Sequence, residues 1–354
     1  MTEVTGVEER LGAREERILL DLVATYIRGR GPVSSRALAE RSPEGLSSAT
    51  VRSVLARLED LGYLHQPHSV SGRIPTDLAY RTFAASILKE ETGRPVHPSR
   101  EEVERLAEDG TLSGVARAIS GRLSDSARLL AFAATPPLDE MRLRSCDLVA
   151  LSPERVLFVL VSQAGQVTER VLRSPRPVGA DTLRWCANFL TETFAGCTLP
   201  EIRRRLAREV EVERERCGQE IASALEMVAP CFTEAPADRG LYWEGAPWLL
   251  ESSVLEEGVD AIRILLRTLE RKTRLLELLE ALHTADRPVR VVLGEDWGDP
   301  QVRTLAMVVA PFGGPTSGRG YVGIVGPRPM PYDTAIPAVR NASVLATLAA
   351  EALE

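Results

Sequence analysis

The sequence predicts an α+β protein in which a small helical domain with a two-stranded hairpin precedes a larger domain of mixed helix and strand. Three observations lead to this fold class. The chain has 354 residues, more than a single hydrophobic core usually organises. Helical periodicity and turn residues alternate over the first 90 residues, and the remainder runs from strands through a helical block back to strands. The composition, 44% hydrophobic and 26% charged, is that of a soluble globular protein.

The N-terminal part is predicted to hold three helices before its hairpin. Apolar residues at helical spacing predict a first helix over 14–29. A second helix begins at Ser34 or Ser35, either of which can cap its N-terminus. A third begins at Ser47 and ends at Gly62. Its predicted buried stripe consists of Val51, Val54, Leu55, Leu58 and Leu61.

A hairpin is predicted to follow the third helix. Residues 63–68 and 73–75 have the prolines of edge strands, and residues 69–72 form a tip that contains glycine. A fourth helix begins at Thr76 or Asp77. Two helices joined by a tight turn and followed by such a hairpin are typical of a winged helix-turn-helix, which places its second helix in the DNA major groove.

The outward face of the third helix predicts contacts with DNA. Short hydroxyl side chains at a helix N-terminus approach phosphates closely, where the backbone N–H groups already favour anions. Arginine on the same face can bond a guanine edge, and Arg73 beside the tip glycine can reach a minor groove or phosphate. The helix alone is weak support, and the hairpin strengthens the prediction. The candidate DNA-binding residues are Ser35, Arg36, Ser47, Ser48, Thr50, Arg52, Ser53, Arg57, His68, Ser71 and Arg73.

The charge distribution agrees with a local DNA-binding face. The whole chain carries a formal net charge of -7, which argues against a surface covered by nucleic acid. Residues 14–89 hold eleven basic and eight acidic side chains, so this segment is basic within an acidic chain. A winged helix used for protein contact remains an alternative, which an acidic or featureless third helix would favour.

Catalytic, metal and cofactor sites are not expected. The five cysteines are scattered and include no C-x-x-C pair. This pattern favours small buried apolar side chains in a reducing compartment over disulfides or metal ligands. His65 and His68 form H-x-x-H without further ligands, whereas zinc needs three or four. Residues 318–323 satisfy G-x-G-x-x-G, but the third glycine lies within a predicted strand, which favours a hairpin loop over a dinucleotide site. We find no catalytic constellation and therefore predict that the chain is not an enzyme.

The sequence also gives no sign of a membrane segment. No apolar run reaches the ~18 residues that span a bilayer, and the N-terminus is polar and acidic where a signal peptide would be basic and then apolar. We expect a cytoplasmic protein without membrane association.

The remainder of the chain is predicted to form an α/β domain with an insertion. Strands are predicted at 128–134, 143–151, 155–162, 167–172, 289–293, 304–310 and 321–326, and helices at 100–109, 113–124, 180–230, 255–283 and 333–353. The predicted organisation is a DNA-binding domain at 1–90, a linker at 91–99, an α/β domain at 100–180 and 286–354, and a mostly helical inserted domain at 181–285.

Several stretches carry a resemblance to a known family. They are Leu46–Arg52 (LSSATVR), Leu58–Gly62 (LEDLG), Ser71–Asp77 (SGRIPTD) with Tyr80-Arg81, Leu241–Gly245 (LYWEG) and Tyr321–Tyr332 (YVGIVGPRPMPY). The match is dense over 17–88 and looser from there to the end. Together these stretches resemble the HrcA family of heat-inducible transcription repressors.

The resemblance implies a fold and a function. The fold would be a winged helix followed by a GAF-like domain that is interrupted by an inserted dimerisation domain. A homodimer would bind double-stranded DNA at an inverted-repeat operator, repress chaperone operons and leave the operator on heat stress, with the GroE chaperonin keeping it active. Two departures affect this expectation: Ser53 stands where many members have asparagine, and residues 246–250 (APWLL) replace a polar stretch.

Two further alternatives remain open from the sequence. One is a winged-helix regulator whose GAF-like domain senses a small ligand, which a stabilising metabolite would favour. The other is an enzyme that uses the winged helix for docking, which a cluster of perturbed titratable groups in a deep pocket would favour.

Overall fold

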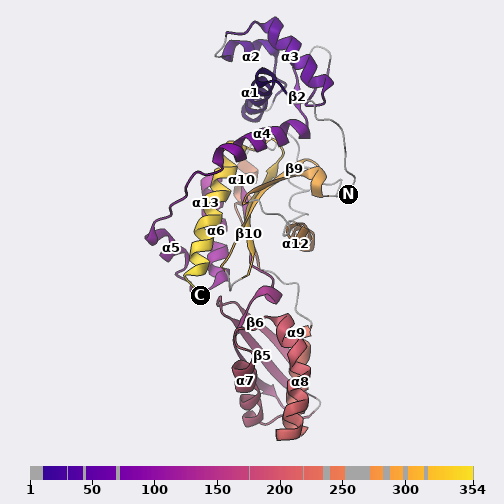
Figure 1. Ribbon diagram of the computed structural model, residues 1–354, viewed down its shortest axis with the longest axis vertical. Helices are drawn as coiled ribbons and strands as arrows, with labels where there is room; N and C mark the ends of the chain where they lie inside the picture. The colour runs from indigo at the N-terminus through magenta and orange to yellow at the C-terminus, as the bar shows by residue number, and fades with distance from the viewer. Residues whose placement is uncertain are drawn as a thin grey trace.

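The computed structural model shows an elongated molecule with three parts along its long axis (Figure 1). A helical N-terminal unit lies at one end, a five-stranded sheet with its helices lies in the middle, and a smaller α/β module lies at the other end. The structure describes residues 11–29, 31–42, 45–68, 72–174, 176–217, 219–233, 240–251, 272–281, 288–297, 302–314 and 318–353.

The N-terminal unit contains the predicted helices and hairpin. Its elements are α1 (Ala13–Gly29), α2 (Ser35–Arg41), α3 (Ser48–Asp60), β1 (Leu64–His65), β2 (Ile74–Pro75) and α4 (Asp77–Glu91). The strands β1 and β2 pair in antiparallel fashion. Leu19 and Leu22 of α1 meet Leu55 and Leu58 of α3 in a core where all four side chains are fully buried. Of the stripe predicted for the third helix, Val51, Leu55 and Leu58 are buried in this core, whereas Val54 and Leu61 are half-buried.

The middle part is built on a five-stranded antiparallel sheet. Its strands, in spatial order, are β7 (Leu241–Glu244), β3 (Leu130–Ala134), β10 (Gly320–Pro327), β9 (Leu305–Phe312) and β8 (Arg290–Leu293). The central strand β10 is buried along its whole length, as its continuous apolar sequence requires. Gly323 lies where a Cβ would be 2.6 Å from the Val308 carbonyl oxygen, so only glycine fits this crossing.

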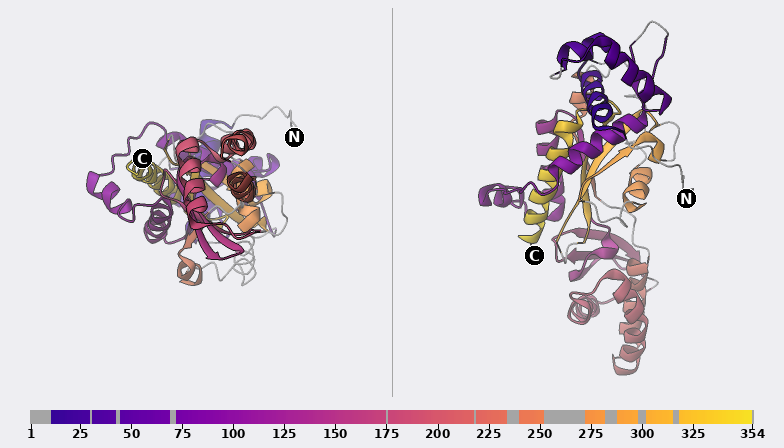
Figure 2. Two further views of the ribbon diagram at one scale, coloured as in Figure 1. Left: turned by 90° about the horizontal axis from the view of Figure 1, so that it is seen from below. Right: turned by 45° about the horizontal axis from the view of Figure 1, so that its top comes forward.

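Helices cover both faces of this sheet (Figures 1 and 2). The helices α6 (Leu112–Ala127) and α13 (Tyr332–Glu351) pack on one face and on each other, with α5 (Arg100–Leu106) beside α13. The helix α12 (Lys272–Ala281) packs on the other face, where Leu275 and Leu279 share a cluster with Phe132 and Met307. The sheet and its helices give the mixed α+β class that the sequence predicted. Among the described residues, none of the helices has the length and apolar character that would carry it through a bilayer.

A separate module is inserted between β3 and β7. It consists of the three-stranded antiparallel sheet β4 (Leu143–Ser152), β5 (Arg155–Ser162) and β6 (Val167–Arg173) with α7 (Ala180–Phe194), α8 (Leu199–Cys217) and α9 (Gln219–Thr233). The helices α7 and α9 cover one face of this sheet. There the rings of Phe158 and Phe232 pack edge to face, with their centroids 5.6 Å apart. The chain leaves the larger sheet at Thr135 and re-enters it at Gly240. The two residues are hydrogen-bonded, with Thr135 N–H donating to the Gly240 carbonyl oxygen at 2.9 Å.

This topology changes the predicted boundaries of the insertion. Residues 181–285 were expected to form it, but the strands at 143–173 also belong to the module, whereas β7 and α12 pack with the larger sheet. The unit inserted between β3 and β7 therefore runs from about 135 to 240 and combines a three-stranded sheet with three helices. Strand periodicity does not reveal which sheet a strand joins, and the helix predicted at 255–283 lies mostly outside the described residues.

Candidate nucleic-acid interface

Two serines fix the start of the helices that form the candidate interface. Ser34 caps α2 by accepting a hydrogen bond from Ala37 N at 3.2 Å. Ser47 caps α3 by accepting from Thr50 N at 3.1 Å, and its hydroxyl also lies 2.9 Å from the Thr50 hydroxyl. Capping satisfies N–H groups that the first turn leaves without a helical partner. Of the two serines considered for α2, Ser34 is the cap, and Ser35 lies in the first turn with its hydroxyl 3.3 Å from that of Ser48.

The α3 helix presents a polar face opposite its buried stripe. Val51, Leu55 and Leu58 face the core, whereas Arg52 and Ser53 are exposed. Neither side chain has a hydrogen bond or ion pair within the described part of the chain. This leaves a guanidinium group and a hydroxyl directed to solvent in the middle of the helix.

The other predicted contacts surround this face. Ser47 and Arg57 are exposed on α3, and Ser48 and Thr50 are half-buried. Arg36 is exposed on α2, where it pairs with Glu40 at 2.8 Å. The structure therefore brings these candidates together around α2 and α3.

The hairpin is attached to the start of α2 as well as to α3. Val33 and Arg73 form an antiparallel bridge through two backbone hydrogen bonds of 2.9 Å each. Gly72 packs so closely here that a Cβ would lie 2.5 Å from the Val33 carbonyl group. The Thr76 hydroxyl donates to the carbonyl oxygens of Gly62 and Tyr63, at 2.8 and 2.9 Å, which holds the far end of the hairpin. His68 is exposed near the tip, and Ser71 lies outside the described residues.

Besides Arg36, two of the predicted arginines are paired with acidic side chains, and both of these pairs join different elements. Arg73 Nε donates to Glu59 Oε2 at 3.0 Å, and only 15% of its side chain is exposed, so it lies against α3 instead of extending from the hairpin. Arg57 Nε lies 2.9 Å from Glu15 Oε1 of α1. The sequence could not indicate these pairings, because Glu15 and Glu59 come close to the arginines only through tertiary packing.

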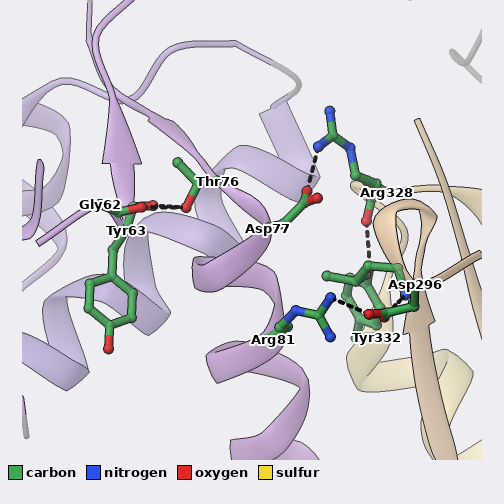
Figure 3. A network of polar contacts seen from close by, with 9 residues as sticks. Gly62, Tyr63, Thr76, Asp77, Arg81, Asp296, Arg328 and Tyr332 are labelled. Carbon is green, nitrogen blue, oxygen red and sulfur yellow. Dashed lines mark hydrogen bonds and ion pairs between the residues drawn. The ribbon is translucent and has the colours of Figure 1, made fainter. Parts of the chain in front are cut away.

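The helix α4 joins the N-terminal unit to the central part (Figure 3). Arg81 Nη2 donates to Asp296 Oδ1 at 2.7 Å, and Asp77 is paired with Arg328. Tyr332 is fully buried between Tyr80 and Phe83, with ring centroids 6.3 and 6.4 Å away, and its hydroxyl donates to the Arg328 carbonyl oxygen at 2.7 Å. Burial raises the pKa of Tyr332 far above its ordinary value.

This joint was missed as a functional element by sequence reasoning. The sequence did contain a sign of this joint. Tyr80-Arg81 and Arg328 to Tyr332 belong to two of the stretches that carry the family resemblance. The structure shows that these stretches, about 250 residues apart in the chain, contact each other. Glu91 at the end of α4 adds a further link, because its carboxylate accepts from Arg340 of α13 at 3.1 Å.

Three of the cysteines, Cys146, Cys186 and Cys231, are buried as apolar side chains are, whereas Cys197 is half-buried. Cys146 and Cys186 are buried in the inserted module. Burial raises the pKa of Cys146 to about 11 and that of Cys186 to about 12, so both thiols stay neutral near pH 7. Among the residues that the structure describes, no three His, Cys, Asp or Glu side chains gather in a metal-binding arrangement.

Comparison with known proteins identifies the family. A sequence model for the HrcA protein C terminal domain matches residues 113–336. The heat-inducible transcription repressor HrcA of Xanthomonas axonopodis pv. citri is 33% identical over 339 residues, 94% of each chain. That of Nitratidesulfovibrio vulgaris strain Miyazaki F is 34% identical over 341 residues, again 94% of each chain. The chain belongs to the HrcA family. Membership in the HrcA family makes it a negative regulator of heat-shock transcription.

A solved structure has a similar overall fold. The crystal structure of a hypothetical protein has a TM-score of 0.62 to this chain at 20% sequence identity, and the alignment covers 98% of this chain and 100% of the other. At this identity the similarity establishes the fold alone.

Proposed function

We propose that this chain represses chaperone operons by binding, as a homodimer, to an inverted-repeat operator in double-stranded DNA, and that heat stress releases it. The observation that carries the proposal is the exposed polar face of α3, with Arg52 and Ser53 directed to solvent beside the hairpin, in a chain of the HrcA family. In this proposal the N-terminal unit is a winged helix-turn-helix and α3 is its recognition helix.

The contacts with DNA follow from the placement of each group. Arg52 lies one turn into α3, so it is assigned to a base edge, where a guanidinium can form two parallel hydrogen bonds with guanine. Ser47, Ser48 and Thr50 lie at the helix N-terminus and are assigned to a phosphate, together with the backbone N–H groups there. Ser53 follows Arg52 on the exposed surface and supplies a shorter contact than the asparagine expected at that position.

The groups around α3 are assigned to the DNA backbone. Ser35 and Arg36 of α2, Arg57 of α3 and the hairpin residues His68, Ser71 and Arg73 would contact phosphates or the adjacent minor groove. Arg73 is held by Glu59 in the free protein, so its contact with DNA requires exchange of that carboxylate for a phosphate. Such contacts position the protein and make its affinity depend on salt.

A homodimer is supported by the uncovered face of the module sheet. Four large apolar side chains of β4 and β6 are exposed there: Val149 (45%), Leu151 (51%), Val167 (60%) and Val171 (48%). The helices α7 and α9 cover the opposite face. Two copies that pair through this face would bury these side chains around a two-fold axis, which matches the symmetry of an inverted repeat.

The GAF-like assignment and the chaperonin complete the proposal. The five-stranded antiparallel sheet with helices on both faces is the part assigned to the GAF-like domain, and the module at 135–240 is assigned to dimerisation. The GroE chaperonin would maintain the active dimer, as the resemblance implies, so that unfolded clients produced by heat would compete for it.

The DNA-binding part is tested with Arg52→Ala. We expect the affinity for a duplex that carries the inverted repeat to fall roughly 10- to 100-fold, because a two-bond arginine–guanine contact contributes about 1–3 kcal/mol. Fluorescence anisotropy gives the affinity, and Arg100→Ala provides a matched control, since Arg100 is exposed on α5 far from α3. Equal losses in both variants, or no loss in either, would contradict the assignment.

The dimer is tested with Val171→Glu. A charged side chain on this uncovered face should prevent pairing, because a carboxylate buried without a partner is costly. Sedimentation velocity should show a dimer for the unsubstituted chain and a monomer for the variant, with Val212→Glu on the exposed side of α8 as the control. A dimer that survives Val171→Glu would place the interface elsewhere.

A further inference from the structure

A hollow in the inserted module lies where the start of β4 meets the connection between α7 and α8. It has a volume of about 530 Å³ and is lined by Arg142, by the loop 195–197 and by side chains from the first two turns of α8. Volumes of 300–1,000 Å³ are typical of small-molecule sites. The hollow therefore has room for a small ligand, and its walls are brought together by the packing of β4 against the end of α7 and the start of α8.

The hollow carries an excess of positive charge. The charged side chains that line it are three arginines, Arg142, Arg204 and Arg205, and one carboxylate, that of Glu201. The Glu201 carboxylate accepts a hydrogen bond from Thr198 N–H at 2.7 Å. This bond is the main reason why the pKa of Glu201 is lowered, and the charges of Arg142 and Arg204 add to it. With Glu201 ionised, the three arginines still exceed the acidic charge of the lining by two.

Two of these arginines are positioned by neutral groups and not by acids. Arg142 Nη1 donates to the Gly196 carbonyl oxygen at 2.7 Å. Arg205 Nη1 donates to Cys197 Sγ at 3.4 Å, and its Cζ lies 5.3 Å from the centroid of the Phe194 ring. Within the described part of the chain, neither arginine forms an ion pair. These contacts fix the two guanidinium groups and leave their charge without a counter-charge.

The third arginine is open to a ligand. Arg204 is exposed on α8, and among the residues that the structure describes it has neither a hydrogen bond nor an ion pair. A guanidinium group offers five N–H donors in a planar fork that fits two oxygens of one phosphate group. The hollow thus combines two positioned guanidinium groups with one that is free to turn onto a ligand.

We propose that this hollow binds a small polyanion that contains two linked phosphate groups, either inorganic pyrophosphate or the diphosphate of a nucleotide. Arg142 and Arg205 donate to the phosphate oxygens from their fixed positions, and Arg204 bonds the ligand from the solvent side. The excess of two positive charges favours a ligand with at least two negative charges. The module lies at the opposite end of the molecule from α3 and the hairpin (Figure 1), so this site is separate from the proposed DNA-binding face and does not rest on it.

Ligand binding has a consequence for the module. A diphosphate held by all three arginines connects the start of β4 to α8 and offsets the repulsion between the guanidinium groups. Because the unfolded chain does not bring these residues together, the ligand binds the folded state preferentially and stabilises it. We therefore expect pyrophosphate to raise the melting temperature of the chain, and sulfate at the same ionic strength to raise it less.

Titration calorimetry with pyrophosphate tests the site on the full chain. We expect saturable binding, and at least about fivefold weaker binding of sulfate, which has a single anionic centre. Arg204→Gln removes one guanidinium and Ala195→Glu adds a carboxylate to the lining; both positions are exposed, so the core is unchanged. We expect each variant to weaken pyrophosphate binding at least about fivefold. Arg184→Gln, exposed on α7 outside the hollow, removes the same charge and should change the affinity by no more than about twofold.

Cys197 reports where the ligand binds. Its side chain is half-buried and lines the hollow, whereas Cys146, Cys186 and Cys231 are buried. Saturating pyrophosphate should slow the alkylation of Cys197 by iodoacetamide at least about threefold, as measured by peptide mass spectrometry. Comparison with ADP identifies the source of the diphosphate: tighter binding of ADP assigns the site to a nucleotide, and weaker binding assigns it to free pyrophosphate.

Four results would each overturn the proposal. They are the lack of saturable pyrophosphate binding at millimolar concentration, equal affinity for sulfate, equal affinity of Arg204→Gln and the unsubstituted chain, and unchanged alkylation of Cys197. DNA binding enters none of these measurements. Their failure would therefore leave the proposed repressor function unaffected, and a chain that binds pyrophosphate without binding the operator would contradict that function alone.

Discussion

The hydroxyl of Tyr332 provides a measurable test of how α4 is joined to the central part. The substitution Tyr332→Phe keeps the ring, which is fully buried and packs edge to face on Phe83, and removes only the donor to the Arg328 carbonyl oxygen. That oxygen also accepts from Met330 N at 2.9 Å, so it keeps one partner in the variant. The expected loss in the free energy of unfolding at pH 8 is therefore about 1 kcal/mol, near the middle of the range for a single hydrogen bond.

The size of this loss should change with pH. Burial raises the pKa of Tyr332 well above the value of about 10 that it has in the unfolded chain. The folded state thus keeps the phenolic proton at a pH where the unfolded state releases it. Stability from this source is fully present below pH 10 and decreases by about 1.4 kcal/mol for each pH unit above it, until the folded-state pKa is reached. The variant has no proton to release at this position and is spared that decrease.

The advantage of the unsubstituted chain should accordingly disappear near pH 11. A loss of about 1.4 kcal/mol over one pH unit offsets the roughly 1 kcal/mol that the hydroxyl contributes at pH 8. Urea unfolding followed by far-UV circular dichroism, with both proteins at pH 8 and pH 11, measures the difference directly. A difference that stays the same or grows between pH 8 and pH 11 would refute the burial of the phenol at the joint.

Three further predictions concern the hairpin and the first helix after the linker. Glu59→Gln removes the carboxylate that holds Arg73, and we expect operator binding to tighten roughly two- to fivefold by anisotropy; weaker binding would show that the pair orients Arg73 for DNA. Gly72→Ala places a Cβ 2.5 Å from the carbonyl group of Val33, so we expect loss of operator affinity and a lower melting temperature, and unchanged values would show that the bridge is not needed. The pKa of Glu102 is lowered to about 2, mainly because its carboxylate accepts a hydrogen bond from the backbone N–H of Ser99. The capping box should therefore remain intact above pH 4.5 and be lost as the pH falls toward 2. An NMR titration that gives Glu102 a midpoint near pH 4.5 would contradict this.

The local elements could be predicted from the sequence because each is determined by its own residues. Strand β5 shows this, since its period-two alternation buries Val156, Phe158 and Leu160 and was predicted over the same residues. Strand β7 was missed, because its four residues are too short for a period and owe their strand structure to pairing with β3. The partition into sheets was missed for a related reason: pairing depends on contacts between strands that are distant in the chain, and alternation carries no information about the partner.

The same distinction applies to the candidate DNA-binding face. The outward position of Arg52 follows from the spacing of Val51 and Leu55 on α3, and the structure has it exposed as that spacing requires. The position of Arg73 depends on Glu59, fourteen residues earlier, and on the bridge to Val33, and neither contact leaves a sequence pattern. Residues whose placement is set by their own helix were predictable, and those placed by tertiary ion pairs were not.

The joint at α4 explains why two distant stretches of this family should change together. Asp77 and Arg81 belong to the helix that follows the hairpin, while their partners Arg328 and Asp296 belong to loops at the ends of β10 and β8. Arg81 and Asp296 are exposed, with 42% and 37% of their side chains accessible, so reversal of one charge alone acts mainly by placing two like charges side by side. Reversal of both charges at once, Arg81→Asp with Asp296→Arg, should therefore retain more operator affinity than either single change. Equal affinity of the double variant and the poorer single variant would mean that α4 is held by the Tyr332 contacts and not by this ion pair.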